Sequence, residues 1–204
     1  LSYSIWLQTK DIKKATVILI LALLCHSTSL IPVSIFFFCT YFGKKYKTQY
    51  FVVIYFVGIA LAFANLGLLN VAPFLKDFLG DDRYVGYLRS ESEEYTVGFK
   101  PQFVAFNTVF MFLFYYASEK LFKNKQEWKI QYDIVFRYFL IASFVFFLAF
   151  QIPYSDRWGL FSWVTIPILA APFFSMDIKT GMYKTTLVVF FGLIFLFFAL
   201  YGKI

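Results

Sequence analysis

Charged and apolar residues of this chain are separated into long blocks. Six windows contain no Asp, Glu, Lys or Arg: 15–43, 48–75, 101–118, 138–155, 158–176 and 185–202. A helix needs about 20 apolar residues to cross the hydrocarbon core of a membrane. Phe, Ile, Leu and Val occupy every side of helices drawn through these windows, as expected of helices that face lipid. Each window therefore predicts a membrane-embedded helix, and none shows the short alternating segments of a membrane barrel.

Five of the windows each predict one full span. We place these spans near Tyr50–Leu69, Gln102–Ser118, Arg137–Gln151, Trp158–Phe174 and Thr185–Tyr201. Pro73 is expected to end the first of them, because proline cannot continue the hydrogen-bond ladder of a helix. The predicted fold class is all-α, a polytopic helical membrane protein, in which residues 1–204 form a single transmembrane domain.

The first window, 15–43, is too long for one upright helix and too short for two crossings. Its middle is a polar run, Cys25–Ser29, and Pro32 follows. This pattern predicts either a single kinked span or a re-entrant hairpin with the polar run at its tip. Irregular backbone at membrane depth persists only where it packs against protein or lines a wet cavity. A hairpin would therefore imply a cavity.

Composition and charge narrow the class of protein and orient it. The chain is 60% hydrophobic and 15% charged, whereas soluble chains are roughly a quarter charged. A disordered chain, a disulfide-stapled secreted domain and a nucleic-acid-binding module are thus excluded. The net charge is +7, and cytoplasmic loops carry the excess of Lys and Arg. A hairpin in the first window places most Lys and Arg residues on the cytoplasmic side and the loop 76–100 on the outer side. A single span would divide the Lys and Arg residues almost equally between the two sides. The charge pattern favours the hairpin.

Two ionisable residues stand out as candidates for chemistry. His26, the one histidine of the chain, lies within the polar run of the first window. Ionisable groups in membrane segments are costly and are candidates for function, and an imidazole can act as a general base at neutral pH. The alternative is a histidine that bonds a backbone carbonyl and orders the kink.

Arg157 opens a predicted span. Ser155 is a candidate helix cap there, and Asp156 suits the positive end of the helix dipole. A guanidinium at a helix start can bind an anion. An interfacial arginine beside Trp158, with its charge extended to water, is the alternative.

The remaining polar features predict no metal or cofactor. The loop 76–100 mixes both charge signs with tyrosines, which suits a glycan surface and equally a solvated loop. Its acidic run Glu91–Glu94 lacks a His or Cys neighbour, so no metal site is expected. No nucleotide-binding motif occurs. Asn65 and Asn107 are expected to bond between helices, and the basic segment Lys120–Lys129 to contact anionic lipid and no nucleic acid.

Three segments resemble a known family. The run Leu21–Pro32 resembles the "apolar run, His, x, Ser, aliphatic" signature of EpsG/Wzy-type bacterial polysaccharide polymerases. Asp156–Pro167 is similar to the Arg-aromatic stretch that opens a late span in that family, and Arg83–Leu88 is similar to a Tyr-x-x-Tyr-Leu pattern of an outer loop. Leu1–Gln8 resembles the tail of a helix before which family members carry further spans. We therefore expect the chain to be the C-terminal part of such a protein.

The resemblance implies a function. It implies polymerisation of lipid-linked glycan repeat units into an exopolysaccharide, capsule or O-antigen, by glycosyl transfer on the outer face of the inner (cytoplasmic) membrane. The implied substrate is a polyprenyl-pyrophosphate-linked oligosaccharide, with membrane lipid and chain-length regulator or flippase proteins as partners, and with no cofactor, metal or nucleic acid. His26 and Arg157 are the expected catalytic residues. The expected substrate-binding residues are Arg83, Tyr84, Tyr87, Ser27, Ser29 and Asp156.

Functions of other classes fit the same residues. A transporter or flippase of a lipid-linked glycan would use a broken helix as its binding site, although the chain shows no internal repeat. A membrane-bound acyltransferase could also place a histidine in a broken apolar segment. A purely structural subunit is the third alternative.

Overall fold

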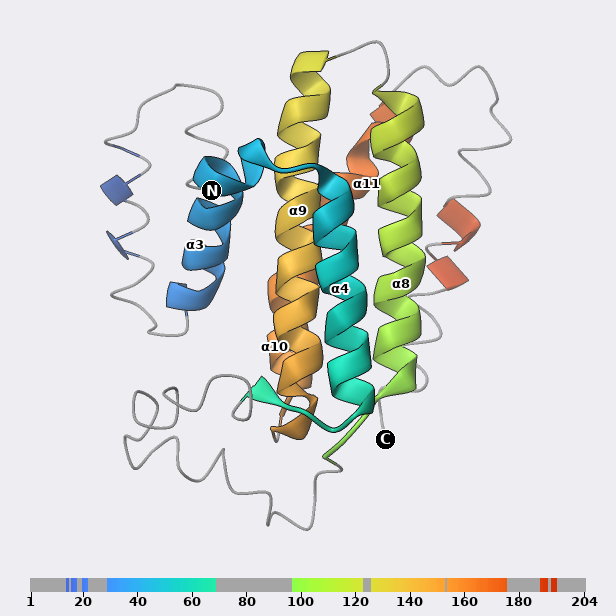
Figure 1. Cartoon of the computed structure of the whole chain (residues 1–204). Coiled ribbons are helices and arrows are strands. Elements are labelled where there is room, and N and C mark those ends of the chain that lie inside the picture. Colours follow the sequence, from blue (N-terminus) through green and yellow to red (C-terminus); the bar gives the residue numbers. More distant parts are fainter. Residues whose placement is uncertain are drawn as a thin grey trace.

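The computed structural model describes most of the central part of the chain. The described residues are 14, 16–17, 20–21, 29–68, 97–122, 126–152, 154–175, 188–190 and 192–193. Within them the chain is all-helical and contains no strand (Figure 1). This confirms the predicted all-α class.

Helix α9 (Gln126–Leu148) lies at the centre of the structure (Figure 1). It contacts α3 (Leu30–Phe37), α4 (Thr48–Phe63), α8 (Pro101–Tyr116), α10 (Asp156–Trp163) and α11 (Ile166–Ser175). Among the described residues one helix, Gln126–Gln151, is long and apolar enough to cross a membrane, and it includes the span predicted near Arg137–Gln151. The number of spans stays a prediction.

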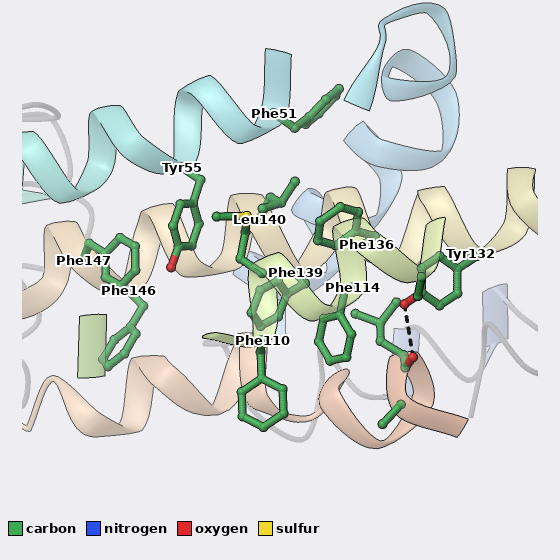
Figure 2. Packing of buried hydrophobic residues seen from close by; sticks show 14 of the residues in the cluster. Phe51, Tyr55, Phe110, Phe114, Tyr132, Phe136, Phe139, Leu140, Phe146 and Phe147 are labelled. Atoms are coloured by element: carbon green, nitrogen blue, oxygen red, sulfur yellow. Dashed lines mark hydrogen bonds between the residues drawn. The ribbon is translucent and has the colours of Figure 1, made fainter. Parts of the chain in front are cut away.

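Aromatic side chains fill the space between the helices (Figure 2). Phe110 of α8 is buried in this core, and Phe114 of α8 lies 5.5 Å from Phe139 of α9 in an edge-to-face arrangement. Tyr55 of α4 lies 5.2 Å from Phe147 in the same way. Edge-to-face pairs place the positive ring edge on the negative ring face and stabilise the core beyond the burial of area.

The helices alternate in direction, so the bundle has two distinct ends. The first end, called here the Lys129 end, contains residues 43–48, 117–122 and 126–133. The second end, called the Arg157 end, contains residues 64–68, 97–101, 150–152 and 154–157. At the Arg157 end Gly98 N–H donates to the carbonyl of Phe150 over 3.0 Å. The two sets lie at opposite ends of the described helices (Figure 1), and the predicted topology places them on opposite sides of the membrane.

Part of the first window is described. Helix α3 continues through a π-helical turn, Phe38–Phe42, and a 3₁₀ turn, Gly43–Lys45. Pro32 lies in the first turn of α3. The backbone N–H groups of a first turn have no acceptor within the helix, so the missing N–H of proline costs no helical hydrogen bond there. Residues 22–28 lie outside the described residues, so the choice between hairpin and kinked span stays a prediction.

Helix α4 ends earlier than the sequence predicts. The predicted span reached Leu69, with Pro73 as its stop, but α4 ends at Phe63. Asn65 has a left-handed backbone (φ 56°), and the N–H groups of Leu66 and Asn65 bond the carbonyls of Leu61 and Ala62. This is the Schellman arrangement that closes a helix with an asparagine in place of glycine.

The predicted span Trp158–Phe174 is divided into two helices, α10 and α11. The helices meet at a turn, Val164–Thr165. Pro167 has no N–H for the carbonyl of Trp163, and its ring crowds that carbonyl, which interrupts the helical ladder. The Thr165 hydroxyl donates to the Ser162 carbonyl over 2.7 Å and partly compensates the break.

Two small residues let α4 approach α9 closely. Gly58 and Ala62 are four residues apart, and both are buried. A Cβ atom on Gly58 would lie 2.8 Å from a ring carbon of Phe144 and 3.3 Å from its Cα. Small residues at such spacing are typical of closely packed membrane helices.

We expect Gly58→Ala to lower the free energy of unfolding by about 1–3 kcal/mol, because the added methyl overpacks the contact with Phe144. Thermal unfolding of the purified protein in detergent measures the change. Ala60→Leu is the matched control: Ala60 is exposed on the same helix, so its effect should stay within about 0.5 kcal/mol. Equal stability of the Gly58→Ala protein and the native protein would contradict the close packing.

Candidate functional site

The structure describes three of the eight predicted site residues. His26, Ser27, Arg83, Tyr84 and Tyr87 lie outside the described residues, so their roles stay predictions. Ser29 is half-buried directly before α3, and Asp156 and Arg157 are exposed in the first turn of α10. The start of α10 is therefore the part of the predicted site that can be described in atomic terms.

Ser155, directly before α10, has a different partner from the predicted one. It makes no capping bond to the backbone of α10. Its hydroxyl, fully buried, accepts a hydrogen bond from the Lys100 ammonium over 2.7 Å. This bond ties the start of α8 to the start of α10. Burial lowers the pKa of Lys100, and the carboxylate of Asp156 opposes that shift.

Arg157 is positioned by an aromatic ring. The centre of its guanidinium lies 4.7 Å from the ring centroid of Tyr154, within the range of a cation–π contact. Tyr154 has a left-handed backbone (φ 57°), a conformation that is uncommon for a bulky residue and costs about 1–3 kcal/mol. Such strain is concentrated at functional sites in proteins. The guanidinium of Arg157 is therefore exposed, and its contact with the Tyr154 ring restricts its position.

Helix α3, which follows Ser29, and helix α10, which carries Arg157, both pack on α9. Phe161 of α10 packs against a cluster that contains Ile35 of α3 and Tyr138 of α9. Pro32 of α3 and Leu160 of α10 line one open groove. Pro32, the last residue of the family-like segment Leu21–Pro32, thus lies beside residues of the second family-like segment, Asp156–Pro167, although the two are far apart in the sequence.

The expected interhelical bond is observed for Asn107, whereas Asn65 lies past the end of α4 and bonds a residue of the 3₁₀ turn Ala149–Gln151. The indole N–H of Trp163 donates to the Asn107 side-chain oxygen over 3.0 Å, and the side-chain amide of Gln151 donates to Asn65 over 3.0 Å. The Asn107 bond connects α8 to the end of α10, where the helix breaks. It fixes the Trp163 ring at that point.

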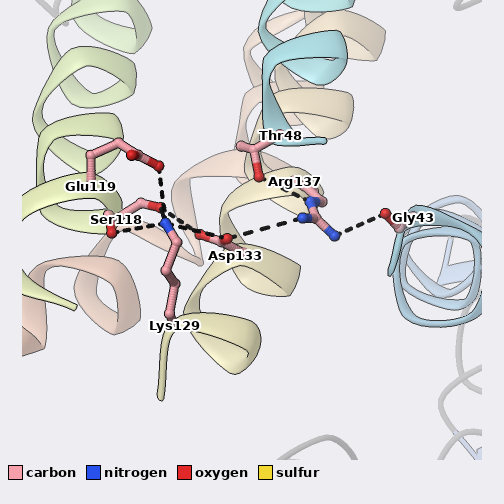
Figure 3. A network of polar contacts seen from close by, with 7 residues as sticks. All are labelled: Gly43, Thr48, Ser118, Glu119, Lys129, Asp133 and Arg137. Carbon is pink, nitrogen blue, oxygen red and sulfur yellow. Dashed lines mark hydrogen bonds and ion pairs between the residues drawn. The ribbon is translucent and has the colours of Figure 1, made fainter. Parts of the chain in front are cut away.

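A buried ionic network at the Lys129 end was missed by sequence reasoning (Figure 3). Asp133 and Arg137 are 8% and 9% exposed, and Asp133 lies 3.7 Å from the Lys129 ammonium and 4.0 Å from the Arg137 guanidinium. The Ser118 hydroxyl donates to Asp133. The signal in the sequence is the spacing of four residues from Lys129 to Asp133 to Arg137, which places the three on one helix face. From the sequence, Lys129 and Arg137 served only to indicate which side of the membrane is cytoplasmic.

Arg137 connects three elements within this network. Its guanidinium donates to the Gly43 carbonyl over 2.8 Å and to the Thr48 hydroxyl over 3.2 Å, and it lies 5.6 Å from the ring centroid of Phe51. Gly43 follows the π-helical turn at the end of α3, and Thr48 begins α4. Because its charges are paired with one another, the network fits a structural clamp better than a site of catalysis.

No group of His, Cys, Asp and Glu in the described part of the chain could hold a metal ion.

The comparison with known proteins agrees with the motifs. The model of the EpsG family matches residues 1–204, the whole chain. No curated protein and no solved structure matches it. The family consists of membrane proteins and contains polysaccharide polymerase-like proteins, which indicates a role in polysaccharide biosynthesis with a lipid-linked sugar substrate. The predicted resemblance is confirmed: the chain belongs to the EpsG family.

Proposed function

We propose that this protein polymerises lipid-linked glycan repeat units into a surface polysaccharide, by glycosyl transfer on the outer face of the inner membrane. The observation that carries the proposal is the groove between α3 and α10, because residues of both segments that resemble the polymerases line it. Pro32 and Leu160 line the same groove, and Arg157 lies exposed in the first turn of α10.

The proposed reaction is a displacement at a sugar carbon. A hydroxyl oxygen of the acceptor glycan attacks the anomeric carbon of the lipid-linked chain, and a new glycosidic bond forms. The bond from that carbon to the pyrophosphate oxygen breaks, and its electron pair leaves with the polyprenyl pyrophosphate. His26 takes the proton of the attacking hydroxyl. The bonds, the electron pair and the proton of this step are all accounted for without a metal or cofactor.

Arg157 stabilises the leaving pyrophosphate in this proposal. A guanidinium offers two parallel N–H donors to phosphate oxygens, and a fixed cation near developing negative charge lowers the barrier. The Tyr154 ring beneath it, 4.7 Å away, limits its motion before the substrate arrives. Asp156, Ser29, Ser27, Arg83, Tyr84 and Tyr87 are assigned to glycan binding around it.

The charge of the two ends supports an outer location of this site. The described lysines of the Lys129 end include Lys45, Lys47, Lys120 and Lys129, as expected of a cytoplasmic end. Since the helices alternate in direction, the Arg157 end then lies at the outer face. A polymer made there needs no further transport across this membrane.

We expect His26→Ala to slow polymer formation by about 10²–10⁴-fold, the usual contribution of a general base. Membranes that contain equal amounts of the protein are supplied with lipid-linked repeat units, and polymer length is read on a gel. His26→Gln, which keeps hydrogen-bonding capacity but cannot take a proton at neutral pH, should be equally slow. Normal polymer from either variant would contradict the role of His26 as base.

The break between α10 and α11 favours a second candidate, because transporters bind substrates at broken helices. Purified protein in liposomes with labelled lipid-linked glycan on one side separates the two functions. The polymerase lengthens the glycan without moving it. Movement of the label across the bilayer, with no lengthening, would favour a flippase.

A further inference from the structure

An open apolar groove of about 590 Å³ lies between α3 and α10. Its wall consists of Pro32, Tyr138, Leu160, Phe161, Trp163 and Val164. Tyr138 belongs to α9, and Phe161 packs against the same cluster as Tyr138. The Trp163 ring is held by the bond from its N–H to Asn107. Three of the lining side chains, Tyr138, Phe161 and Trp163, are thus held by their neighbours, which reduces the entropic cost of binding a ligand.

The exposed side of α10 carries a cation beside this groove. Arg157, Leu160, Phe161 and Val164 are spaced by three or four residues, so they share one side of the helical segment. Leu160 and Val164 are 59% and 63% exposed, and Arg157 lies one turn nearer the helix start. At 1.5 Å per residue, Val164 lies about 10 Å from Arg157 along the axis. The exposed Arg157 thus lies on the same side of α10 as the groove residues, one turn before Leu160.

This pairing defines the chemistry of the ligand. It fits a molecule with a hydrocarbon chain and a phosphate at one end, the chain buried against apolar side chains and the phosphate bound bidentately. Resting on the proposed function, we propose that the groove binds the first isoprenoid units of the lipid-linked glycan while its pyrophosphate lies at Arg157. The groove would then fix the position of the reacting sugar by holding the lipid that carries it.

Photolabelling tests the assignment on the full chain in liposomes. The probe is a polyprenyl diphosphate with a diazirine in its second isoprene unit. We expect it to label the peptide that contains residues 160–164, and excess unlabelled polyprenyl diphosphate to remove the label. A phosphatidylglycerol with a diazirine in its acyl chain is the comparison, because ordinary lipid also has an apolar chain and an anionic head. The phosphatidylglycerol probe should label this peptide weakly, and excess unlabelled polyprenyl diphosphate should not reduce that labelling.

Leu160→Trp fills the groove with a side chain that is already exposed, so the fold should tolerate it. We expect labelling to fall about tenfold, and KM for the lipid-linked substrate to rise about tenfold with little change in kcat, because about two methylene groups lose their burial. Val53→Trp is the matched control, since Val53 is 60% exposed on α4, away from the groove. It should change neither value.

The outcomes separate this inference from the proposed function. Unchanged labelling and unchanged KM in Leu160→Trp would overturn the groove and leave the polymerase role intact. Equal, uncompetable labelling by phosphatidylglycerol would also overturn it, because the groove would then hold ordinary lipid. Competable labelling of residues 160–164 in a protein that forms no polymer would support the groove and overturn the polymerase role.

Discussion

Arg157→Ala is expected to reduce polymer formation by about 10²–10³-fold, the usual loss when one fixed donor to a developing negative charge is removed. The loss should appear in kcat, because the charge on the pyrophosphate increases as the glycosidic bond breaks. Arg157→Lys should recover part of the rate, since an ammonium keeps the charge but lacks the two parallel donors. Polymer yield and length at equal protein amount measure the effect.

The fold should be unaffected by this substitution. Arg157 is exposed, so the free energy of unfolding should stay within about 0.5 kcal/mol of the native value. Lys120→Ala is a matched control, because Lys120 is an exposed cation at the opposite end of the bundle and should leave the rate unchanged. Normal polymer from the Arg157→Ala protein would exclude a catalytic role for this residue. If Arg157→Ala and Lys120→Ala reduced polymer formation equally, the loss would come from the change in net charge and would not indicate a specific role of Arg157.

Arg137→Ala is expected to have the largest effect on stability, about 3–5 kcal/mol, because it removes one partner of a buried ion pair. Asp133 would keep only Lys129 as a cationic partner, and the Gly43 carbonyl would lose its guanidinium donor. Unfolding in detergent, followed by temperature or denaturant, measures the change.

A double-mutant cycle separates the ion pair from the other bonds of Arg137. If the pair itself matters, Asp133→Leu combined with Arg137→Met should be less destabilising than the sum of the two single changes, because no unpaired charge remains. Strict additivity would show that the bonds from Arg137 to Gly43 and Thr48 carry the effect. Native stability in Arg137→Ala would refute the clamp.

The positions of the central helices were predictable because these helices correspond to long stretches of sequence without charged residues. The uncharged window 101–118 predicted the position of α8, and window 138–155 predicted much of α9. Two of the differences from the predicted spans have local causes. Asn65 closes α4 through its left-handed backbone, a cap usually formed by glycine, and Pro167 breaks the predicted span at a point where the apolar pattern continues.

The candidate site was predictable only in part. The position of Arg157 at a helix start followed from the order of charged and apolar residues. The bond between Lys100 and Ser155 did not, because it joins residues 55 positions apart and depends on how α8 and α10 pack. The network around Asp133 was missed for a related reason: charge counting treats each basic residue as a mark of a loop, whereas Arg137 pairs inside the protein.

The order of the partners along the chain has a consequence for how the protein enters the membrane. Among the described residues, every bond from Asp133 and Arg137 to another helix or turn reaches a residue earlier in the sequence, namely Gly43, Thr48 and Ser118. Chains are synthesised from the N-terminus, and unpaired charges are costly in a bilayer. When the ribosome completes α9, the hydrogen-bond partners of Asp133 and Arg137 on earlier elements have already been made, so α9 can insert beside them.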